Sequence, residues 1–393
     1  MRDKNIILYL LYQFTFGLYP VIPIMSLFFL AKSLTFADIG ILFAVFSLTG
    51  FLFEIPTGYI GDKYGRKYSV MLGLAILAVT AYVWTILNSV FMFAIFAGVW
   101  MLGLAFISGS FEGYIYDYLK SKNKEQLYDN LLAKSGTILY AAGAIGSIIG
   151  AYLFSFNRNF PYYLLSLLFI FCFVITSFME DDAQLPEGES EGQEQLKVFS
   201  GMSYIYKHKN ILWLTVFVSL LFGFFSYFRS SVDKPYILSL GIFDVKWLGV
   251  FVAISMLMQS AFISQFERIK SKLKESGTII FYWALSSIPL LLMAVGNGYI
   301  ALLAILAFYM TESFQETLLN SFSQKHIPSN IRATALSSMK VYLNIGGAVL
   351  GLVAGYMFNV ISIRNGLLIA FVYTIIVLVS MYTYKRACPT TFT

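Results

Sequence analysis

Charged residues are scarce in this chain of 393 residues, because Asp, Glu, Lys and Arg together make up only 12% of it, against roughly 25% in ordinary soluble domains. Hydrophobic residues reach 58% and aromatic residues 18%, which excludes a soluble globular protein and indicates an integral membrane protein. The net charge of +6 does not indicate nucleic-acid binding, because the basic residues lie in short segments between apolar runs.

Residues that bind metals or react covalently are equally rare. The chain has two cysteines, Cys172 and Cys388, and two histidines, His208 and His326. Their spacing matches neither a CxxC pair nor a zinc site. The sequence also contains no phosphate-binding glycine loop and no recognisable pair of nucleophile and base. We therefore expect no metal, no cofactor and no enzymatic activity.

Long apolar runs fill most of the chain, and each is long enough for a membrane-spanning helix of about 20 residues. They predict an all-α membrane protein. The twelve expected spans are residues 6–31, 37–60, 68–87, 90–117, 131–155, 160–179, 211–239, 246–266, 276–295, 298–322, 333–358 and 364–384.

Lys and Arg lie mostly at one end of these spans, which is also the end where both termini lie if the number of spans is even. The positive-inside rule then predicts a multi-pass protein of the inner (cytoplasmic) membrane of the cell, with both termini in the cytoplasm.

One long polar connection, residues 180–210, separates two predicted six-helix bundles, residues 1–179 and 211–393. Its acidic opening is interpreted as a solvated tether in the cytoplasm.

The two halves also match each other. A displacement of the sequence by 205 residues carries Gly146 onto Gly351 and Gly150 onto Gly355. This match predicts that the two halves are repeats of one another.

A charged turn rich in glycine stands between the second and third predicted spans. It reads GYIGDKYGRK over residues 58–67, and its charges cannot enter lipid. Gly58 and Gly61 are expected to let two helix ends approach closely, and Gly65 to permit a reversal of the chain. A basic turn that serves only as a topology anchor is the alternative.

The pattern of this turn resembles the loop between helices 2 and 3 of the major facilitator superfamily of secondary transporters, and the resemblance covers essentially the whole chain. It implies two pseudo-symmetric six-helix bundles that expose a central site to each side of the membrane in turn.

The resemblance also implies a gate at the cytoplasmic end. Asp62 is expected to pair there with residues at the cytoplasmic ends of the fourth and eleventh spans, for which Asp117 and Arg332 are candidates. Glu54 could brace this gate or take part in transport. The predicted gate residues are Gly58, Asp62, Lys63, Gly65, Arg66, Lys67, Glu54, Asp117 and Arg332.

Glutamates inside spans are candidates for proton coupling, because an ionisable group there costs about 2.5 to 3.5 kcal/mol and needs a partner or a function. In the first half the candidate is Glu112, for which a permanent salt bridge to Lys134 is the alternative. In the second half Glu312 and Glu316 lie four residues apart and so share a helix face, with Lys340 as a candidate partner.

The seventh predicted span carries Tyr227, Arg229, Asp233 and Lys234. Arg229 is permanently charged and suited to hold a carboxylate or phosphate. Asp233 and Lys234 stand nearer the outer end of the span, where we expect an ion pair of an outer gate.

The first span has no acidic residue, and Pro20 and Pro23 are expected to bend it. A carboxylate that couples proton movement to transport is therefore expected outside the first span. The predicted residues of the substrate cavity are Tyr12, Gln13, Tyr19, Tyr227 and Asn344.

The fifth span has glycines at 143, 146 and 150 and resembles the antiporter motif of the drug-exporting branch of this superfamily, without its usual proline. Close helix packing alone also explains such spacing.

The resemblance implies a monomer in the lipid bilayer that transports a small molecule, with no nucleic-acid partner. Our first hypothesis is proton-coupled export of a small amphipathic compound such as an antibiotic, a drug or a short peptide. Uptake of a small nutrient and a non-transporting membrane sensor or scaffold remain alternatives.

Overall fold

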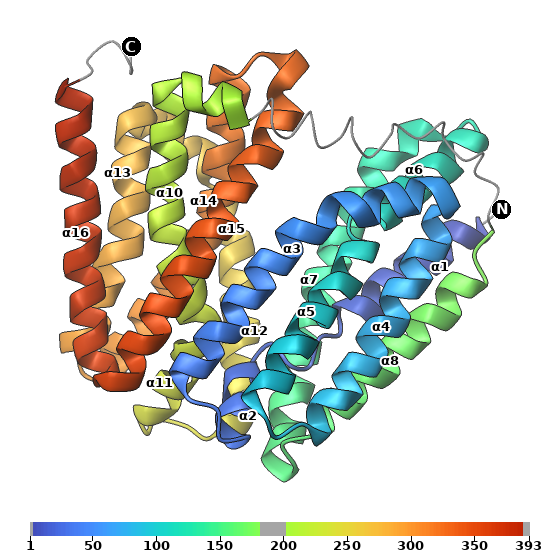
Figure 1. The fold of residues 1–393 in the computed structure, drawn as a ribbon, viewed down its shortest axis with the longest axis horizontal. Helices are drawn as coiled ribbons and strands as arrows, with labels where there is room; N and C mark the ends of the chain where they lie inside the picture. Colours follow the sequence, from blue (N-terminus) through green and yellow to red (C-terminus); the bar gives the residue numbers. More distant parts are fainter. Residues whose placement is uncertain (1–2, 181–201, 388–393) are drawn as a thin grey trace. The chain divides into compact units, whose positions relative to one another are not determined.

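The computed structural model describes residues 3–180 and 202–387, which form helices joined by short connections (Figure 1). The predicted tether at 180–210 lies mostly outside these residues. The helices before it are α1 (Lys4–Gly17), α2 (Met25–Ala31), α3 (Phe36–Tyr64), α4 (Arg66–Ile86), α5 (Val90–Ile107), α6 (Ser110–Ser121), η1 (Glu125–Leu127), α7 (Tyr128–Phe156) and α8 (Phe160–Ser177).

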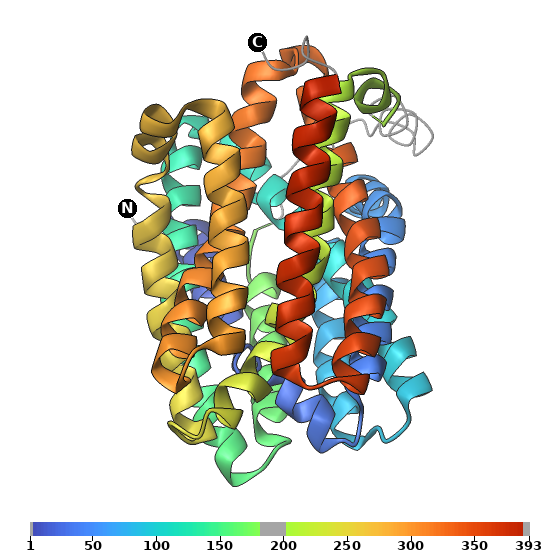
Figure 2. The ribbon, with the colours of Figure 1, turned by 90° about the vertical axis from the view of Figure 1, so that its left-hand side faces the viewer.

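The helices after it include a short π-helical segment, η2. They are α10 (Lys209–Tyr227), η2 (Phe228–Val232), α11 (Asp233–Ser239), α12 (Val245–Ile263), α13 (Phe266–Val295), α14 (Gly298–His326), α15 (Ser329–Val360) and α16 (Ile363–Ala387). The last helix, drawn in red, runs beside α10 and α13 (Figure 2).

Eleven helical segments of the described chain are long and apolar enough to cross a membrane. The first predicted span, 6–31, differs because it is broken into α1 and α2. Pro20 and Pro23 lie in the break, where proline removes backbone donors and cannot continue a helix. The bend expected from these two prolines is therefore a complete interruption.

Two other predicted spans contain irregular turns. The span at 90–117 consists of α5 and α6, which meet at Gly109, a residue with a φ of 73° that favours glycine. The span at 211–239 contains η2 just before Pro235. A proline ring clashes with the carbonyl group four residues earlier, which accounts for the wider π turn at this point.

Contacts divide the described chain into two compact units. The first contains residues 3–33, 48–180 and 243–254, and the second contains 34–47, 202–242 and 255–387. The first part of α3 is thus packed with the second unit, and the first part of α12 with the first unit. The predicted bundle boundaries do not include these two exchanges and remain a prediction.

The first unit has a core of aromatic rings around the broken helix. Trp84 of α4 stacks on Trp100 of α5 with 4.9 Å between ring centroids, and Phe28 of α2 contacts Tyr162 of α8 at 4.1 Å. The glycines of α7 make room for the break, because a Cβ added at Gly150 would lie 1.7 Å from the carbonyl oxygen of Pro20. The glycine-rich motif of this helix therefore has a packing role.

The second unit uses glycine in the same way where α3 meets α15. A Cβ added at Gly40 would lie 2.9 Å from the carbonyl oxygen of Gly351 and 3.2 Å from the Cα of Gly355. The Tyr227 hydroxyl of α10 donates a hydrogen bond of 2.6 Å to the Phe36 carbonyl beside this contact. Such small-residue contacts let helices pack closely in lipid, where the hydrophobic effect does not drive association.

Candidate functional site

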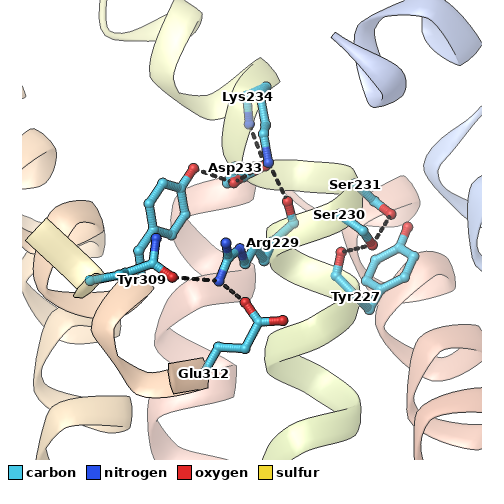
Figure 3. A network of polar contacts seen from close by, with 9 residues as sticks. Tyr227, Arg229, Ser230, Ser231, Asp233, Lys234, Tyr309 and Glu312 are labelled. Carbon is cyan, nitrogen blue, oxygen red and sulfur yellow. Dashed lines mark hydrogen bonds and ion pairs between the residues drawn. The ribbon is translucent and has the colours of Figure 1, made fainter. Parts of the chain in front are cut away.

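Five charged or phenolic residues of the second unit form a polar cluster among apolar helices (Figure 3). Arg229 comes from η2, Asp233 and Lys234 from the first turn of α11, and Tyr309 and Glu312 from neighbouring positions of α14. Two ion pairs result, and they differ in their exposure.

The first ion pair joins Lys234 Nζ to Asp233 Oδ2 at 2.7 Å, with side-chain exposures of 8% and 0%. The carboxylate also accepts hydrogen bonds from the Lys234 backbone N–H at 2.7 Å and from the Tyr309 hydroxyl. A buried charge pair needs such additional hydrogen bonds to offset the loss of hydration. The two residues are therefore paired as the sequence predicts, and their role in an outer gate stays a prediction.

The second ion pair joins Arg229 Nη1 to Glu312 Oε2, and here the carboxylate side chain is 55% exposed. The guanidinium group lies 5.0 Å from the centroid of the Tyr309 ring, and its Nη1 is 3.4 Å from Gln259 Oε1. Arg229 is thus held on three sides, whereas Glu312 can be reached by water or by a ligand.

The sequence predicted Lys340 as the partner of the glutamates on α14, and the structure gives Arg229 instead. Lys340 and Glu316 are exposed, and no ion pair joins either of them to another described residue. The sequence could not identify this partner, because Arg229 is far from Glu312 along the chain. Residue spacing within one helix does not predict which residue of another helix lies opposite it.

Lys234 also connects the two ion pairs. Its Nζ donates a second hydrogen bond, of 2.6 Å, to the backbone carbonyl of Arg229. The carbonyl belongs to the π turn, where the regular helical pattern of backbone hydrogen bonds is changed. The ammonium group therefore stabilises the backbone that carries the guanidinium group.

A small pocket lies beside the Arg229–Glu312 pair. Three phenylalanines form apolar walls, and an amide and two hydroxyl groups supply neutral polar contacts. The pocket is lined by Phe222, Phe225, Ser226, Arg229, Phe308, Thr311, Glu312 and Gln315. Its lining of apolar walls with a few polar groups is of the kind found in small-molecule sites, and in this conformation its volume of about 20 Å³ admits a group of about the size of a water molecule.

A second charged cluster lies in the first unit, at the turn that follows α3. Arg66 bridges two carboxylates, with its Nε 2.9 Å from Asp62 Oδ1 and its Nη1 3.0 Å from Asp117 Oδ2. Gly113 makes this position possible, because a Cβ there would lie 2.0 Å from Arg66 Nη1. The structure thus brings together three of the predicted gate residues.

The connection between α3 and α4 is a single residue, Gly65, which has a φ of 107°. Lys67 Nζ donates to the carbonyls of Ser177 and Met179 at 3.1 and 2.7 Å, at the end of α8. Lys63 lies over the rings of two tyrosines, and these exposed contacts raise its pKa.

Gly58, Glu54 and Arg332 are the remaining predicted gate residues. Gly61 does permit a close approach, with Ser110 Oγ 2.8 Å from an added Cβ, but Gly58 has no described atom within 4 Å of that position. Glu54 is exposed. The side chain of Arg332 lies outside the described part of the structure, so its pairing stays a prediction.

Residues predicted for the substrate cavity are mostly packed in this structure. Tyr12 is 1% exposed and lies against Phe111, with ring centroids 3.9 Å apart. Gln13 donates to the Tyr9 hydroxyl at 3.0 Å, and Tyr19 meets Trp100 edge to face. A cavity role for these residues stays a prediction.

The remaining candidates are distributed over both units. Tyr227 is buried with its hydroxyl bonded to α3, and Asn344 of α15 is half-buried. Glu112 is exposed in the first turn of α6, and no ion pair joins it to Lys134 among the described residues.

Sequence reasoning missed several residues that hold these sites. Tyr309 lies three residues before Glu312 on the same helical face, so the spacing rule could have identified it. Gln259 is a polar residue within an apolar run, which is also a usable signal. Asn5 and Tyr114, which together hold the Glu180 carbonyl, could not be paired without the fold.

Comparison with known proteins gives a consistent result. The family model of the Major Facilitator Superfamily matches residues 6–351. The chain is 25% identical to YxaM, an uncharacterized MFS-type transporter of Bacillus subtilis, over 364 residues that cover 89% of this chain and 87% of YxaM. It is 22% identical to the quinolone resistance protein NorA of Staphylococcus aureus over 369 residues, which cover 92% of this chain and 91% of NorA.

Solved structures show the same fold. The nucleoside transporter NupG superposes with a TM-score of 0.79 at 16% identity, covering 97% of this chain and 98% of NupG. A D-xylose-proton symporter superposes with a TM-score of 0.71 at 11% identity, covering 96% of each chain.

Proposed function

This chain belongs to the Major Facilitator Superfamily and is a multi-pass secondary transporter of small molecules, and from that premise we propose that it exports a small amphipathic compound in exchange for protons. Its relation to NorA, whose name records quinolone resistance, supports the direction of transport and the class of compound. The related bacterial proteins support a place in the inner membrane.

The Arg229–Glu312 pair carries the proposal. Its carboxylate is half exposed in a phenylalanine-walled pocket, while its arginine is held by other groups. A proton and the cationic group of a substrate can therefore compete for Glu312, and competition for one carboxylate is what exchange requires. The aromatic walls bind the apolar body of the substrate and favour its positive charge.

Uptake of a substrate is the second candidate function, and it is supported by Arg229, the other residue of the same ion pair. Protonation of Glu312 would break its ion pair with Arg229, and the guanidinium group could then hold an anionic substrate, so that proton and substrate bind together. The two functions differ in the charge of the substrate and in the compartment where it accumulates.

Opening and closing of the site would depend on the cluster in the first unit. We assign the ion pairs of Arg66 with Asp62 and Asp117 to a latch at the end that the positive-inside rule places in the cytoplasm. Arg332 remains a further candidate partner.

The test uses purified protein in liposomes with an acidic lumen and a fluorescent fluoroquinolone outside. Exchange predicts accumulation in the acidic lumen above that of protein-free liposomes, and loss of this excess in Glu312→Gln. Asp244→Asn removes one negative charge from an exposed position that does not line the pocket, and it is expected to keep the activity.

The alternatives give different results in the same assay. Accumulation only when the outside is acidic would replace export by uptake. A rise in melting temperature with the fluoroquinolone, without flux under either gradient, would instead indicate a sensor.

A further inference from the structure

A second hollow of the second unit lies between the start of α13 and the last turns of α14, with a volume of about 310 Å³. It does not overlap the pocket at Arg229. Its lining residues are Glu267, Lys270, Ser271, Lys274, Thr278, Leu318, Ser321, Phe322 and Lys325.

Positive charge dominates this lining. Three lysines reach it, from two helices, against one glutamate that lies 3.9 Å from Lys270. Ser321 adds a hydroxyl group that can donate to an anion, whereas the hydroxyls of Ser271 and Thr278 donate to the carbonyls of Arg268 and Lys274. The chemistry of the hollow therefore favours a compact group with more than one negative charge or acceptor oxygen.

The backbone places one of these lysines in an unusual conformation. Lys274 has a φ of 56° and a ψ of −178° inside α13, a region that residues other than glycine rarely adopt. The Thr278 hydroxyl donates a hydrogen bond of 2.6 Å to the Lys274 carbonyl and so stabilises the kink. The kink separates a charged first part of the helix from the apolar span that begins at Ser276.

The hollow thus lies where a candidate membrane span begins, at Ser276, and the start of a span is expected at the depth of lipid headgroups. One wall is apolar, because it is formed by the side chains of Leu318 and Phe322, which are each 5% exposed. Basic pockets between membrane helices at this depth bind the headgroups of anionic lipids.

We propose that this hollow binds the phosphate of an anionic phospholipid headgroup, with Lys270, Lys274 and Lys325 around the phosphate and the glycerol part against Leu318 and Phe322. The site is separate from the transport pocket, so the proposal does not depend on the transported compound. The phosphate chemistry would also admit free phosphate, and the test separates the two sources.

The chain offers a matched control on the same helix segment. Lys270→Gln/Lys274→Gln and Arg268→Gln/Lys272→Gln each remove two positive charges, but only the first pair lines the hollow. Full-length protein in neutral detergent is titrated with phosphatidylglycerol, with phosphatidylcholine or with inorganic phosphate. The melting temperature and the lipid retained in native mass spectra are recorded.

We expect phosphatidylglycerol to raise the melting temperature of the unmodified protein and of Arg268→Gln/Lys272→Gln. Its half-saturating concentration should rise about tenfold or more in Lys270→Gln/Lys274→Gln. Lys325→Gln, on the other helix, should weaken binding in the same direction.

Equal weakening in both double variants would overturn the proposal, because it would show attraction to the surface charge as a whole. Equal stabilisation by phosphatidylcholine would overturn it as well. Protection by inorganic phosphate but not by phosphatidylglycerol would overturn the lipid as the source and assign the hollow to a soluble phosphate compound.

Discussion

The buried pair of Asp233 and Lys234 gives a prediction whose size follows from its burial. With side-chain exposures of 0% and 8%, neither charge can recover its hydration when the other is removed. Asp233→Asn or Lys234→Met should therefore each destabilise the protein by about 3 to 5 kcal/mol. Asp233→Asn/Lys234→Met removes both charges and should be much closer to the stability of the original protein.

The measurement is a double-mutant cycle on the purified protein, with unfolding followed in increasing concentrations of a denaturing detergent. Asp244 and Lys246 provide the control, because they form an ion pair of 3.8 Å with exposures of 80% and 48%. Their cycle should give a coupling energy below about 1 kcal/mol. A similarly small coupling energy for the buried pair would refute the reasoning from burial.

In Asp233→Asn/Lys234→Met, transport should be impaired although most of the stability is kept. Lys234→Met also removes the hydrogen bond of 2.6 Å to the Arg229 carbonyl, so the π turn loses a charged donor to its backbone. We expect faster amide hydrogen exchange at 228–232 and a raised KM for the transported compound, with the rest of the fold unchanged. Unchanged exchange at the π turn would show that Lys234 only neutralises Asp233.

Three further predictions concern the first unit. Gly113→Ala should displace the Arg66 guanidinium and abolish its bridge, so that Arg66→Gln adds little further loss of stability or transport rate in the double variant; additive effects would contradict this. Burial raises the pKa of Asp3, but the hydrogen bonds from Lys124 and Tyr118 lower it by a larger amount. The net pKa therefore lies below the usual value for an aspartate. The stabilisation by this residue, about 1 kcal/mol at most, is therefore present at neutral pH and lost as the pH falls through the lowered pKa. The melting temperatures of the original protein and of Asp3→Asn should accordingly converge below about pH 4. Gly150→Ala should destabilise by about 1 to 3 kcal/mol through overpacking, whereas Gly136→Ala on the same helix, with no atom within 4 Å of the new methyl group, should be neutral or slightly stabilising.

The sequence was sufficient for the family and for most of the spans, because a run of about 20 apolar residues has few alternatives to a membrane helix. It was insufficient for the breaks inside them. Gly109 lies among other glycines of its span, and the π turn lies in a segment that also carries serines and charges before Pro235. The length of a span carries no information about a single irregular turn inside it. The first span was the exception, since two prolines marked its break.

The charged residues were found from sequence more easily than their partners. Arg229, Asp233, Lys234 and Glu312 are all conspicuous in apolar surroundings, and the Asp233–Lys234 pair is adjacent in the chain. The pairing of Glu312 with Arg229 joins residues that are 83 positions apart (312 minus 229). Such a pair depends on how η2 and α14 pack, which one sequence without a fold does not determine.

The two ion pairs of the second unit share a cation–π partner but are suited to different tasks. Tyr309 donates its hydroxyl to Asp233, while its ring lies 5.0 Å from the Arg229 guanidinium and 5.7 Å from Lys234 Nζ. Asp233 is surrounded by donors and inaccessible, so its protonation would require the loss of several hydrogen bonds at once. Glu312 has one strong partner and a half-exposed carboxylate, so a proton or a substrate cation can replace that partner at much lower cost. We therefore propose that the exchange takes place at Glu312 and that Asp233, Lys234 and Tyr309 hold Arg229 in place.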